Sequence, residues 1–409
     1  MLKSLQKMPL LLAMMIIATG QVGVAIYLPS LPLISHDLGL TQADVQNVVT
    51  FFLVGFGASQ LFYGPLSDAI GRRPVFILGQ GIYLVGTVIC IAFSSSIEAL
   101  ELGRLLQGLG AGSASVLGRS VLRDSYEGAQ LTKALSYISI TASIMPIIAP
   151  VFGGWIAFHV SWQAVFVFVL CYLLAIFTLG YFVLPETLPY AKRRFRPLTV
   201  LATYRTLATY RTLATYRTLA TNPQVIGSAS FNWMSYLVSL VSLSVFPFMM
   251  QGELGFSAAD YGSMMIIPSA GLLLGSVTVN VLLRYFEVKR LLAASFVLVA
   301  LSGYGLIWAP FSSVSLIAAF TVMSFAQGMS FPLSISLLLA PHKQNAGSVS
   351  ALSGSVQMVM AALLGGFLVE HCVRTQAQLG LFYILVAMGC FAVLLLKGKV
   401  MTTPEVQKV

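Results

Sequence analysis

Charged side chains are scarce in this sequence. It has 23 basic and 13 acidic residues among 409, or 9% charged, whereas soluble domains carry about 25%. Apolar residues make up 57% of the chain instead. Because a bilayer-spanning helix needs about 20 mostly apolar residues, this content suffices for roughly eleven or twelve spans. The composition excludes an ordinary soluble enzyme and predicts a polytopic membrane protein.

The sequence also lacks the pattern of a transmembrane β-barrel, in which segments of about ten residues alternate apolar and polar positions. Its apolar runs are long and unbroken, as in residues 9–18 and 381–396. We therefore expect an all-α integral membrane protein with twelve transmembrane helices in two six-helix bundles. The first run is span-length and has no small-residue cleavage site, so we interpret it as a span. The expected spans are residues 8–29, 44–64, 74–93, 98–118, 134–156, 162–184, 224–250, 259–282, 290–310, 314–340, 348–369 and 379–396.

Cysteine and histidine are equally sparse, with four of each. The cysteines are expected mostly within spans, and only Cys372 near the outer face, so no disulfide framework is indicated. The histidines fall singly in short loops, without the paired spacing of a metal site. No Ser/His/Asp constellation for catalysis is present either. The sequence thus predicts neither an enzyme nor a bound metal or cofactor.

The few charges are distributed unequally along the chain. With the N-terminus in the cytoplasm, 21 of the 23 basic residues fall on the cytoplasmic side, whereas Arg374 lies outside and Arg104 lies within a span. The net charge is then +15 inside and −5 outside. This pattern follows the positive-inside rule and predicts that both termini are cytoplasmic. The basic excess therefore indicates topology and attraction to anionic lipid headgroups, and it does not indicate nucleic-acid binding.

The longest polar stretch, residues 186–222, is expected to be a cytoplasmic linker. It separates an N-terminal bundle at residues 1–185 from a C-terminal bundle and short cytoplasmic tail at 223–409. Within it, TYRTLA occurs three times between Thr203 and Ala220. Six residues turn a helix by about 600°, so the three tyrosines would share no face. We expect a duplicated linker segment; the alternative is a functional helix on the inner membrane surface, with the repeat's arginines near headgroups.

The two halves of the chain contain matching residue pairs in corresponding spans. Gln107-Gly108 in the fourth span matches Gln327-Gly328 in the tenth, at an offset of 220 residues. Gly153-Gly154 in the fifth span matches Gly365-Gly366 in the eleventh, at an offset of 212. These matches favour a duplicated architecture, which many secondary transporters use to form a substrate site near the membrane midplane.

One segment between the second and third spans carries a sharply defined pattern of Gly64, Asp68, Gly71, Arg72 and Arg73. The glycines permit a tight reversal because glycine adopts positive φ freely. Asp68 can pair with the neighbouring arginines or point at a helix N-terminus. The alternative is a short charged turn without a special role. The pattern resembles the signature loop of the major facilitator superfamily, where the loop acts as a conformational switch.

Two further segments resemble signatures of the same superfamily. Residues 100–112 resemble its fourth-span motif, which has a membrane-embedded arginine, here Arg104. The fifth span resembles the antiporter motif through Pro146, Pro150, Gly153 and Gly154, although Ala149 stands where a glycine is expected. With Tyr27-Leu28-Pro29 and Trp162, the chain is most similar to the Bcr/CflA branch of drug:proton antiporters, and within it to EmrD-like multidrug exporters.

Arg104 and Glu101 are the candidates for proton coupling. A charge near mid-bilayer costs at least ~2.5 kcal/mol, so Arg104 should face a partner or a cavity. Glu101 precedes it by three residues, on the same helical face. Either the two form a structural pair near the outer rim, or Arg104 modulates proton uptake, as the resemblance implies. Relatives often carry an acid just before Tyr27, but Ala25 stands there, so the residue that carries the proton is unassigned.

The glycines of the fifth span have two interpretations. They can simply allow close helix packing next to the bend at Pro150. By resemblance, they would form a flexible seal that controls leakage.

The substrate cavity is expected to be lined by spans one, four, seven and ten, with spans two, five, eight and eleven at its flanks. Polar groups among aromatic and methionine surfaces suit varied apolar ligands. Any one of the candidates could instead face lipid or a neighbouring helix. They are Gln21, Tyr27, Asn47, Phe51, Gln60, Gln107, Asn232, Trp233, Tyr236, Gln327, Phe331, Gln357 and Met358.

These features together predict a monomeric multidrug efflux transporter of a bacterial-type inner membrane. It would exchange amphipathic small-molecule drugs for protons by alternating access. The first alternative is an exporter of a single metabolite class, such as a sugar or an amino-acid derivative, on the same fold. A second, from another class, is a membrane receptor or assembly partner that transports nothing.

Overall fold

The computed structural model describes residues 7–184, 186, 221–341 and 346–396. Most of the predicted linker, including the TYRTLA repeats, lies outside these ranges. The chain divides into two compact units, Met1–Ala214 and Thr215–Val409, and each is described by itself. Helices alone make up the regular structure of the described residues.

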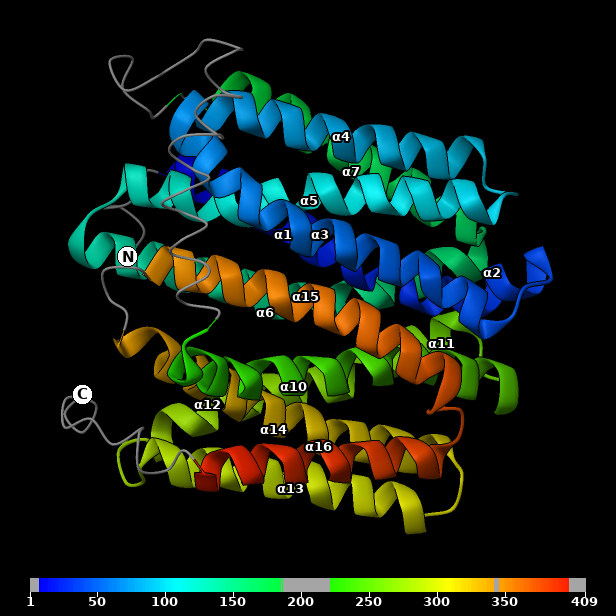
Figure 1. Ribbon diagram of the computed structural model, residues 1–409. Helices are drawn as coiled ribbons and strands as arrows, with labels where there is room; N and C mark the ends of the chain where they lie inside the picture. The colour runs from blue at the N-terminus through cyan, green and yellow to red at the C-terminus, as the bar shows by residue number, and fades with distance from the viewer. Residues whose placement is uncertain (1–6, 185, 187–220, 342–345, 397–409) are drawn as a thin grey trace. The chain divides into compact units, whose positions relative to one another are not determined.

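The N-terminal unit contains the first six predicted spans (Figure 1). The first span is divided into three helices, and the other five are single helices. The elements are α1 (Lys7–Ala25), η1 (Leu28–Ser30), α2 (Leu31–Leu38), α3 (Gln42–Ile70), α4 (Arg72–Ala92), α5 (Ile97–Ser125), α6 (Gly128–His159) and α7 (Trp162–Val183).

The C-terminal unit contains the other six spans, two of them interrupted. A short π-helix, η4, ends the seventh span, and the eighth breaks at Met265. The elements are α10 (Pro223–Pro247), η4 (Phe248–Glu253), α11 (Ala258–Met264), α12 (Ile266–Leu282), α13 (Val288–Trp308), α14 (Ser313–Leu339), α15 (Ala346–His371) and α16 (Gln376–Leu396).

The helices account for all twelve predicted spans. Among the described residues, ten helices are long and apolar enough to cross a membrane, and the apolar stretch Ile144–His159 within α6 is a shorter one. The twelfth is α5, which carries charged and small residues along its length. Large apolar side chains are exposed on both units, for example Phe182 at 78% and Trp308 at 74%. Such surfaces suit a lipid environment.

Several helices extend beyond the predicted span ends. The hydropathy pattern ends the second and fourth spans at residues 64 and 118, whereas α3 continues to Ile70 and α5 to Ser125. The pattern marks the edge of the hydrocarbon core. Backbone hydrogen bonding carries the helix further, because a helical turn tolerates charged residues once it has left the core. This difference moves the signature segment from a loop into a helix.

Hydroxyl side chains begin many of the helices. Thr41 accepts a hydrogen bond from the backbone N–H of Asp44, and the Asp44 carboxylate accepts from the Thr41 N–H, which completes a capping box for α3. Ser257 and Asp260 do the same for α11. Such caps satisfy backbone donors that the first helical turn leaves without partners. They are local, because each capping residue directly precedes its helix.

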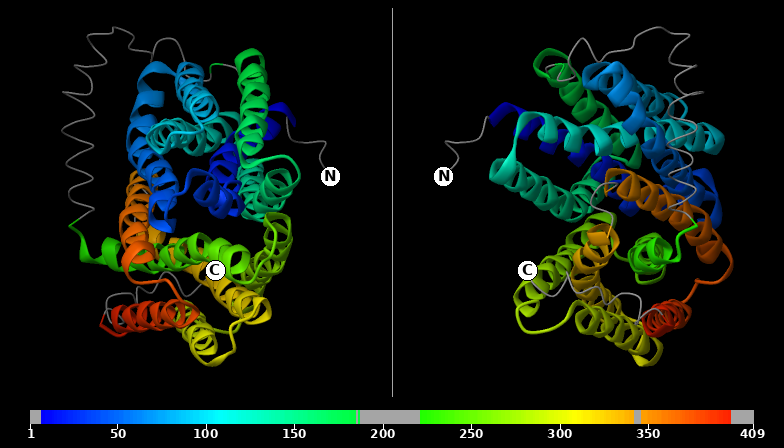
Figure 2. Two further views of the ribbon diagram at one scale, coloured as in Figure 1. Left: turned by 90° about the vertical axis from the view of Figure 1, so that its right-hand side faces the viewer. Right: turned by 60° about the vertical axis from the view of Figure 1, so that its left-hand side comes forward.

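Close glycine contacts hold α5 at the centre of the N-terminal unit, between α1, α3 and α4 (Figure 2). A Cβ atom at Gly108 would overlap the Phe52 carbonyl oxygen of α3. A Cβ at Gly55 would lie 2.5 Å from the Leu105 carbonyl oxygen of α5. The two helix backbones therefore approach more closely than any side chain would allow.

The C-terminal unit repeats this contact between α12 and α14. A Cβ at Gly328 would overlap the Leu272 carbonyl oxygen, and one at Gly275 would overlap that of Phe325. All four residues lie 220 positions after their N-terminal counterparts. The predicted internal repeat is therefore visible as the same backbone contact in both units. The second sequence match is not: Gly153 closely approaches the Ile26 carbonyl, whereas a Cβ at Gly365 would meet ordinary contacts of 3.5 Å.

Candidate functional site

The signature segment is the last turn of α3 followed by a one-residue turn at Gly71. Gly71 has a φ of 108°, a value that side chains disfavour, and α4 begins at the next residue. Gly64 was expected to take part in the reversal, and this prediction is wrong. It lies inside α3, away from any positive φ, because the helix continues past it to Ile70. Only one of the two glycines therefore makes the turn.

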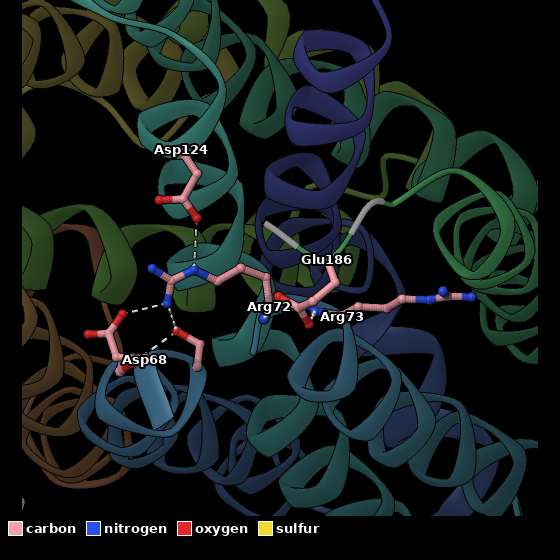
Figure 3. Close-up of polar contacts among 7 residues, drawn as sticks. Asp68, Arg72, Arg73, Asp124 and Glu186 are labelled. Atoms are coloured by element: carbon pink, nitrogen blue, oxygen red, sulfur yellow. Dashed lines mark hydrogen bonds and ion pairs between the residues drawn. The ribbon is translucent and has the colours of Figure 1, made fainter. Parts of the chain in front are cut away.

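Arg72 joins three helices through its side chain (Figure 3). Its Nη1 lies 2.5 Å from Oδ1 of Asp68 and donates to the Ser67 hydroxyl at 2.8 Å, both on α3. Its Nε donates to Oδ2 of Asp124, on α5, at 3.0 Å. Arg72 is buried, at 8% exposure. We call Asp68, Arg72 and Asp124 the Arg72 clamp, since they fix the ends of α3, α4 and α5 to one another.

The start of α4 is also joined to the end of α7. The Glu186 carboxylate accepts hydrogen bonds from the backbone N–H groups of Arg72 and Arg73, at 3.1 and 3.2 Å. The Arg73 guanidinium donates to the Tyr181 carbonyl oxygen at 2.8 Å and lies 5.3 Å from the centroid of that ring. The sequence alone indicates no role for Asp124 or Glu186. Each is far from Arg72 in the chain, so no local spacing could connect them.

Arg104 is completely buried within the N-terminal unit. Its Nε donates to the Val48 carbonyl oxygen of α3 at 3.1 Å, and its Nη1 donates to the Gly23 carbonyl oxygen of α1 at 3.0 Å. The guanidinium also lies 4.5 Å from the ring centroid of Tyr27 and 4.2 Å from that of Phe52. A buried cation is thus held by carbonyl dipoles and ring faces.

Glu101 does not pair with Arg104, which contradicts the structural pair considered from the sequence. Among the described residues, the ion pairs are Arg72–Asp68, Arg72–Asp124, His36–Asp37 and His371–Glu370. Side chains three residues apart lie about 60° apart around a helix. Arg104 points towards α1 and α3, and its side-chain partners are Val48, Gly23 and Gln107, whereas Glu101 is half-buried on the same helix.

Gln107 is buried in this structure and holds Arg104 in place. Its Oε1 accepts from Arg104 at 2.8 Å, and its Nε2 donates to the Thr87 hydroxyl at 2.9 Å. Tyr27 and Gln327 are also buried; the exposures of Gln107, Tyr27 and Gln327 are 0%, 1% and 3%, respectively. These three cavity candidates thus make their contacts within the protein interior in this structure. Gln60 and Gln357 are nearly enclosed, each at 9%. The candidates that stay exposed or half-buried are Gln21, Asn47, Phe51, Asn232, Trp233, Tyr236, Phe331 and Met358.

Several of the C-terminal candidates take part in hydrogen bonds that join α10 to its neighbouring helices. The Asn232 amide donates to the Gln357 carbonyl group, on α15, at 2.7 Å. The Trp233 indole donates to the carbonyl oxygen of Ser353 at 3.0 Å. On the α14 side, Gln327 donates to the Ser235 carbonyl oxygen at 3.2 Å. The structure thus brings these predicted residues together within one unit.

The fifth-span residues that resemble the antiporter motif differ in exposure. Pro146 is exposed, whereas Pro150, Gly153 and Gly154 are buried, and α6 continues through both prolines. Gly153 approaches the Ile26 carbonyl, at the point where the first span breaks between α1 and η1. The glycine therefore permits a close contact with a non-helical part of the first span.

Comparison with known proteins identifies the class to which this architecture belongs. The family model of the Major Facilitator Superfamily matches residues 10–365. The chain belongs to this superfamily of membrane transporters. The predicted fold class, an all-α protein with twelve membrane helices, is confirmed. The resemblance to the major facilitator superfamily is confirmed as well.

Among its relatives are proteins named for drug resistance. The chain is 29% identical over 399 residues to multidrug resistance protein D (EmrD) of Escherichia coli (strain K12), with 94% of each chain covered. It is 28% identical over 342 residues to multidrug resistance protein MdtL of Klebsiella pneumoniae subsp. pneumoniae, with 83% of each covered. The crystal structure of a mutant of the nucleoside transporter NupG has a TM-score of 0.72 at 15% identity. It covers 95% of this chain and 99% of its own, and it shows the fold alone.

Proposed function

We propose that this chain exports amphipathic toxic compounds across a bacterial inner membrane by proton-coupled alternating-access antiport. The observation that carries the proposal is the similarity to multidrug resistance protein D along 94% of the chain. The strong excess of basic residues on one side of the predicted spans supports an inner-membrane protein with both termini in the cytoplasm. We propose that it acts as a monomer.

In this proposal, the Arg72 clamp is the conformational switch. It joins the ends of α3, α4 and α5 on the predicted cytoplasmic side, so it favours whichever state keeps these ends together. The Asp68 side chain is 70% exposed, whereas Arg72 is buried. Asp68 is therefore a solvent-accessible partner of Arg72, which can part from it without burying a charge. A switch of this kind needs only different contacts in the two states.

Arg104 is the proposed modulator of proton uptake, with Glu101 as a candidate carrier. No ion pair to Arg104 occurs among the described residues, so its positive charge is balanced by dipoles and ring faces. Such a charge disfavours a second cation nearby and favours an anion, and both effects are stronger in a medium of low dielectric constant. The electric field of Arg104 would thus make the affinity for a proton depend on which other cations or anions lie nearby within the membrane.

The proposed substrate contacts combine amides with aromatic and methionine surfaces. In the N-terminal unit these are Gln21, Asn47 and Phe51, and in the C-terminal unit Asn232, Trp233, Tyr236, Phe331 and Met358. Broad apolar contact with few polar groups suits ligands of varied shape. The remaining candidates are buried in this structure and would contact a compound in another state of the cycle; they are Tyr27, Gln60, Gln107, Gln327 and Gln357.

Dye efflux from proteoliposomes tests the function directly. The protein is reconstituted and an inward proton gradient is imposed, with and without a membrane potential. The proposal requires dye extrusion that follows the pH gradient and is abolished by a protonophore. Flux without any response to the gradient would exclude antiport, and absence of flux for every dye would favour a receptor or assembly role. Competition confined to one metabolite class, such as sugars, would favour the alternative exporter.

A further inference from the structure

The first backbone N–H donors of α4 are satisfied by a residue that is distant in the chain and follows α7. The first N–H groups of any helix lack intrahelical acceptors. At α4 the preceding residue is Gly71, which has no side chain to offer. Glu186 supplies one carboxylate oxygen to Arg72 N–H and the other to Arg73 N–H, from 114 and 113 residues away. A carboxylate there also lies at the positive end of the helix dipole.

Gly71 leaves the space that this carboxylate occupies. A Cβ at Gly71 would overlap Oε2 of Glu186 and lie 2.7 Å from its carboxyl carbon. The glycine is thus required twice, by its positive φ and by the approach of Glu186. The turn at Gly71 and the capping carboxylate of Glu186 therefore depend on each other.

A remote cap does more than stabilise the start of a helix. At α3, α5 and α7, a hydroxyl residue directly before the helix makes the cap, so these helices are capped without any tertiary contact. At α4, capping requires the segment after α7 to be in place. Formation of the α4 start is therefore coupled to the position of that segment.

The same residue, Arg72, is held by its backbone and by its side chain. Its backbone N–H binds Glu186, next to α7, while its guanidinium binds Asp68 and Asp124, on α3 and α5. Arg73 adds a second contact to α7 through Tyr181. If Glu186 leaves, the backbone that presents the Arg72 guanidinium loses its anchor.

We propose that Glu186 is a positioning residue of the Arg72 clamp. It stabilises the state in which Arg72 bridges α3 and α5, and so it sets the rate of the conformational cycle without touching the transported compound. This inference rests on the proposed role of the clamp in transport. Its structural part, the capping of α4 by Glu186, stands independently of which compound is exported.

Hydrogen exchange of the Arg72 and Arg73 amides tests the cap. Purified wild-type protein in nanodiscs is compared with Glu186→Ala and Glu186→Gln. Loss of a capping carboxylate should speed exchange of these two amides about tenfold in Glu186→Ala, and less in Glu186→Gln, which keeps one acceptor. Glu127→Gln is the matched control, because Glu127 is an exposed glutamate that precedes α6 without capping it by its side chain. Equal exchange in all four proteins would overturn the proposal.

Transport kinetics test the positioning role. Glu186→Gln should lower the maximal rate of dye efflux and leave KM for the dye unchanged. In an Asp124→Asn background the same change should have a smaller effect, because both act on Arg72 and their effects are not additive. Full additivity would overturn coupling through the clamp. A chain that exports no dye but shows the exchange response would reject the proposed function and retain the cap.

Discussion

The Arg104 guanidinium donates to the Gly23 carbonyl oxygen at 3.0 Å, in the last turn of α1. The last four carbonyls of a helix lack intrahelical donors, and a cation is favourable at this end of the helix. Arg104 therefore caps α1 just before the first span breaks. The residue that the superfamily resemblance links to proton uptake thus also stabilises the break in the first span.

Substituting Arg104 by Ala should weaken proton-driven export and lower stability. The change removes the charge and leaves the Gly23 carbonyl and the Gln107 amide oxygen without a donor, at a cost of roughly 1–3 kcal/mol for each unsatisfied group. Proteoliposome efflux measured across a series of pH gradients checks the first effect, and thermal unfolding in detergent checks the second.

A lysine at this position separates charge from geometry. Arg104→Lys keeps the positive charge but cannot reach three acceptors with a fixed fork. We expect it to retain more of the pH dependence than Arg104→Ala while remaining destabilised. Unchanged pH dependence in both variants would contradict a role of Arg104 in coupling.

Substituting Asp68 by Asn should impair transport while the protein remains in the membrane. Asp68 is an exposed partner of Arg72, and exposed ion pairs contribute about 0–1 kcal/mol, so folding should be little affected. The clamp, in contrast, loses the charge that attracts Arg72. Dye efflux normalised to membrane protein level is the measurement, with Glu127→Gln as the control. Wild-type flux in Asp68→Asn would argue against the switch role.

The sequence predicts contacts between side chains well where they depend on the spacing of two residues in a helix. It predicts them poorly where they depend on the direction in which each side chain points. Asp68 and Arg72 are four residues apart, and a pair with a neighbouring arginine is one of the two interactions that the sequence predicts for Asp68. Glu101 and Arg104 are close in the chain too, but their side chains point to different neighbours. Spacing gives the face of a helix, while the choice of partner depends on what the neighbouring helices offer.

Contacts to backbone groups and to carboxylates far away in the chain could not be predicted from the sequence, for a different reason. Arg104 binds carbonyl oxygens of Gly23 and Val48, which every residue type carries, so no residue pattern marks them. Glu186 caps α4 from 114 residues away. The twelve spans, by contrast, could be predicted because burial in lipid demands about 20 apolar residues wherever a helix crosses.

The two glycines of the signature segment should differ sharply in their response to alanine. Gly71→Ala places a Cβ at a φ of 108° and against Glu186, so it should destabilise by at least about 1–2 kcal/mol and lower transport. Gly64→Ala adds a Cβ that meets nothing within 4 Å apart from its chain neighbours, and Pro65 disfavours a Cβ-bearing residue in this helical position, so it should destabilise less than Gly71→Ala. Thermal unfolding and dye efflux of both variants decide. Equal damage in the two variants would mean that the positive φ of Gly71 and its contact with Glu186 do not set its sensitivity.

Deleting one TYRTLA repeat should be nearly silent. The three copies lie outside the described residues, and their six-residue period gives no common helical face. A linker with two copies keeps the same composition, and loop length has a small effect on stability. Efflux and membrane insertion of the deletion variant are the readouts. A large loss of activity would support a functional helix on the membrane surface.

The repeated glycine contacts should make the two units respond alike. Gly108→Ala pushes a methyl group into the Phe52 carbonyl, and Gly328→Ala does the same to Leu272. Overpacking of this kind costs about 1–3 kcal/mol, so both variants should unfold at lower temperature. Gly81→Ala on α4 and Gly389→Ala on α16 are matched controls, because a Cβ there meets nothing within 4 Å. If only one of the two buried glycines proves sensitive, the shared backbone contact is not equally important in both halves.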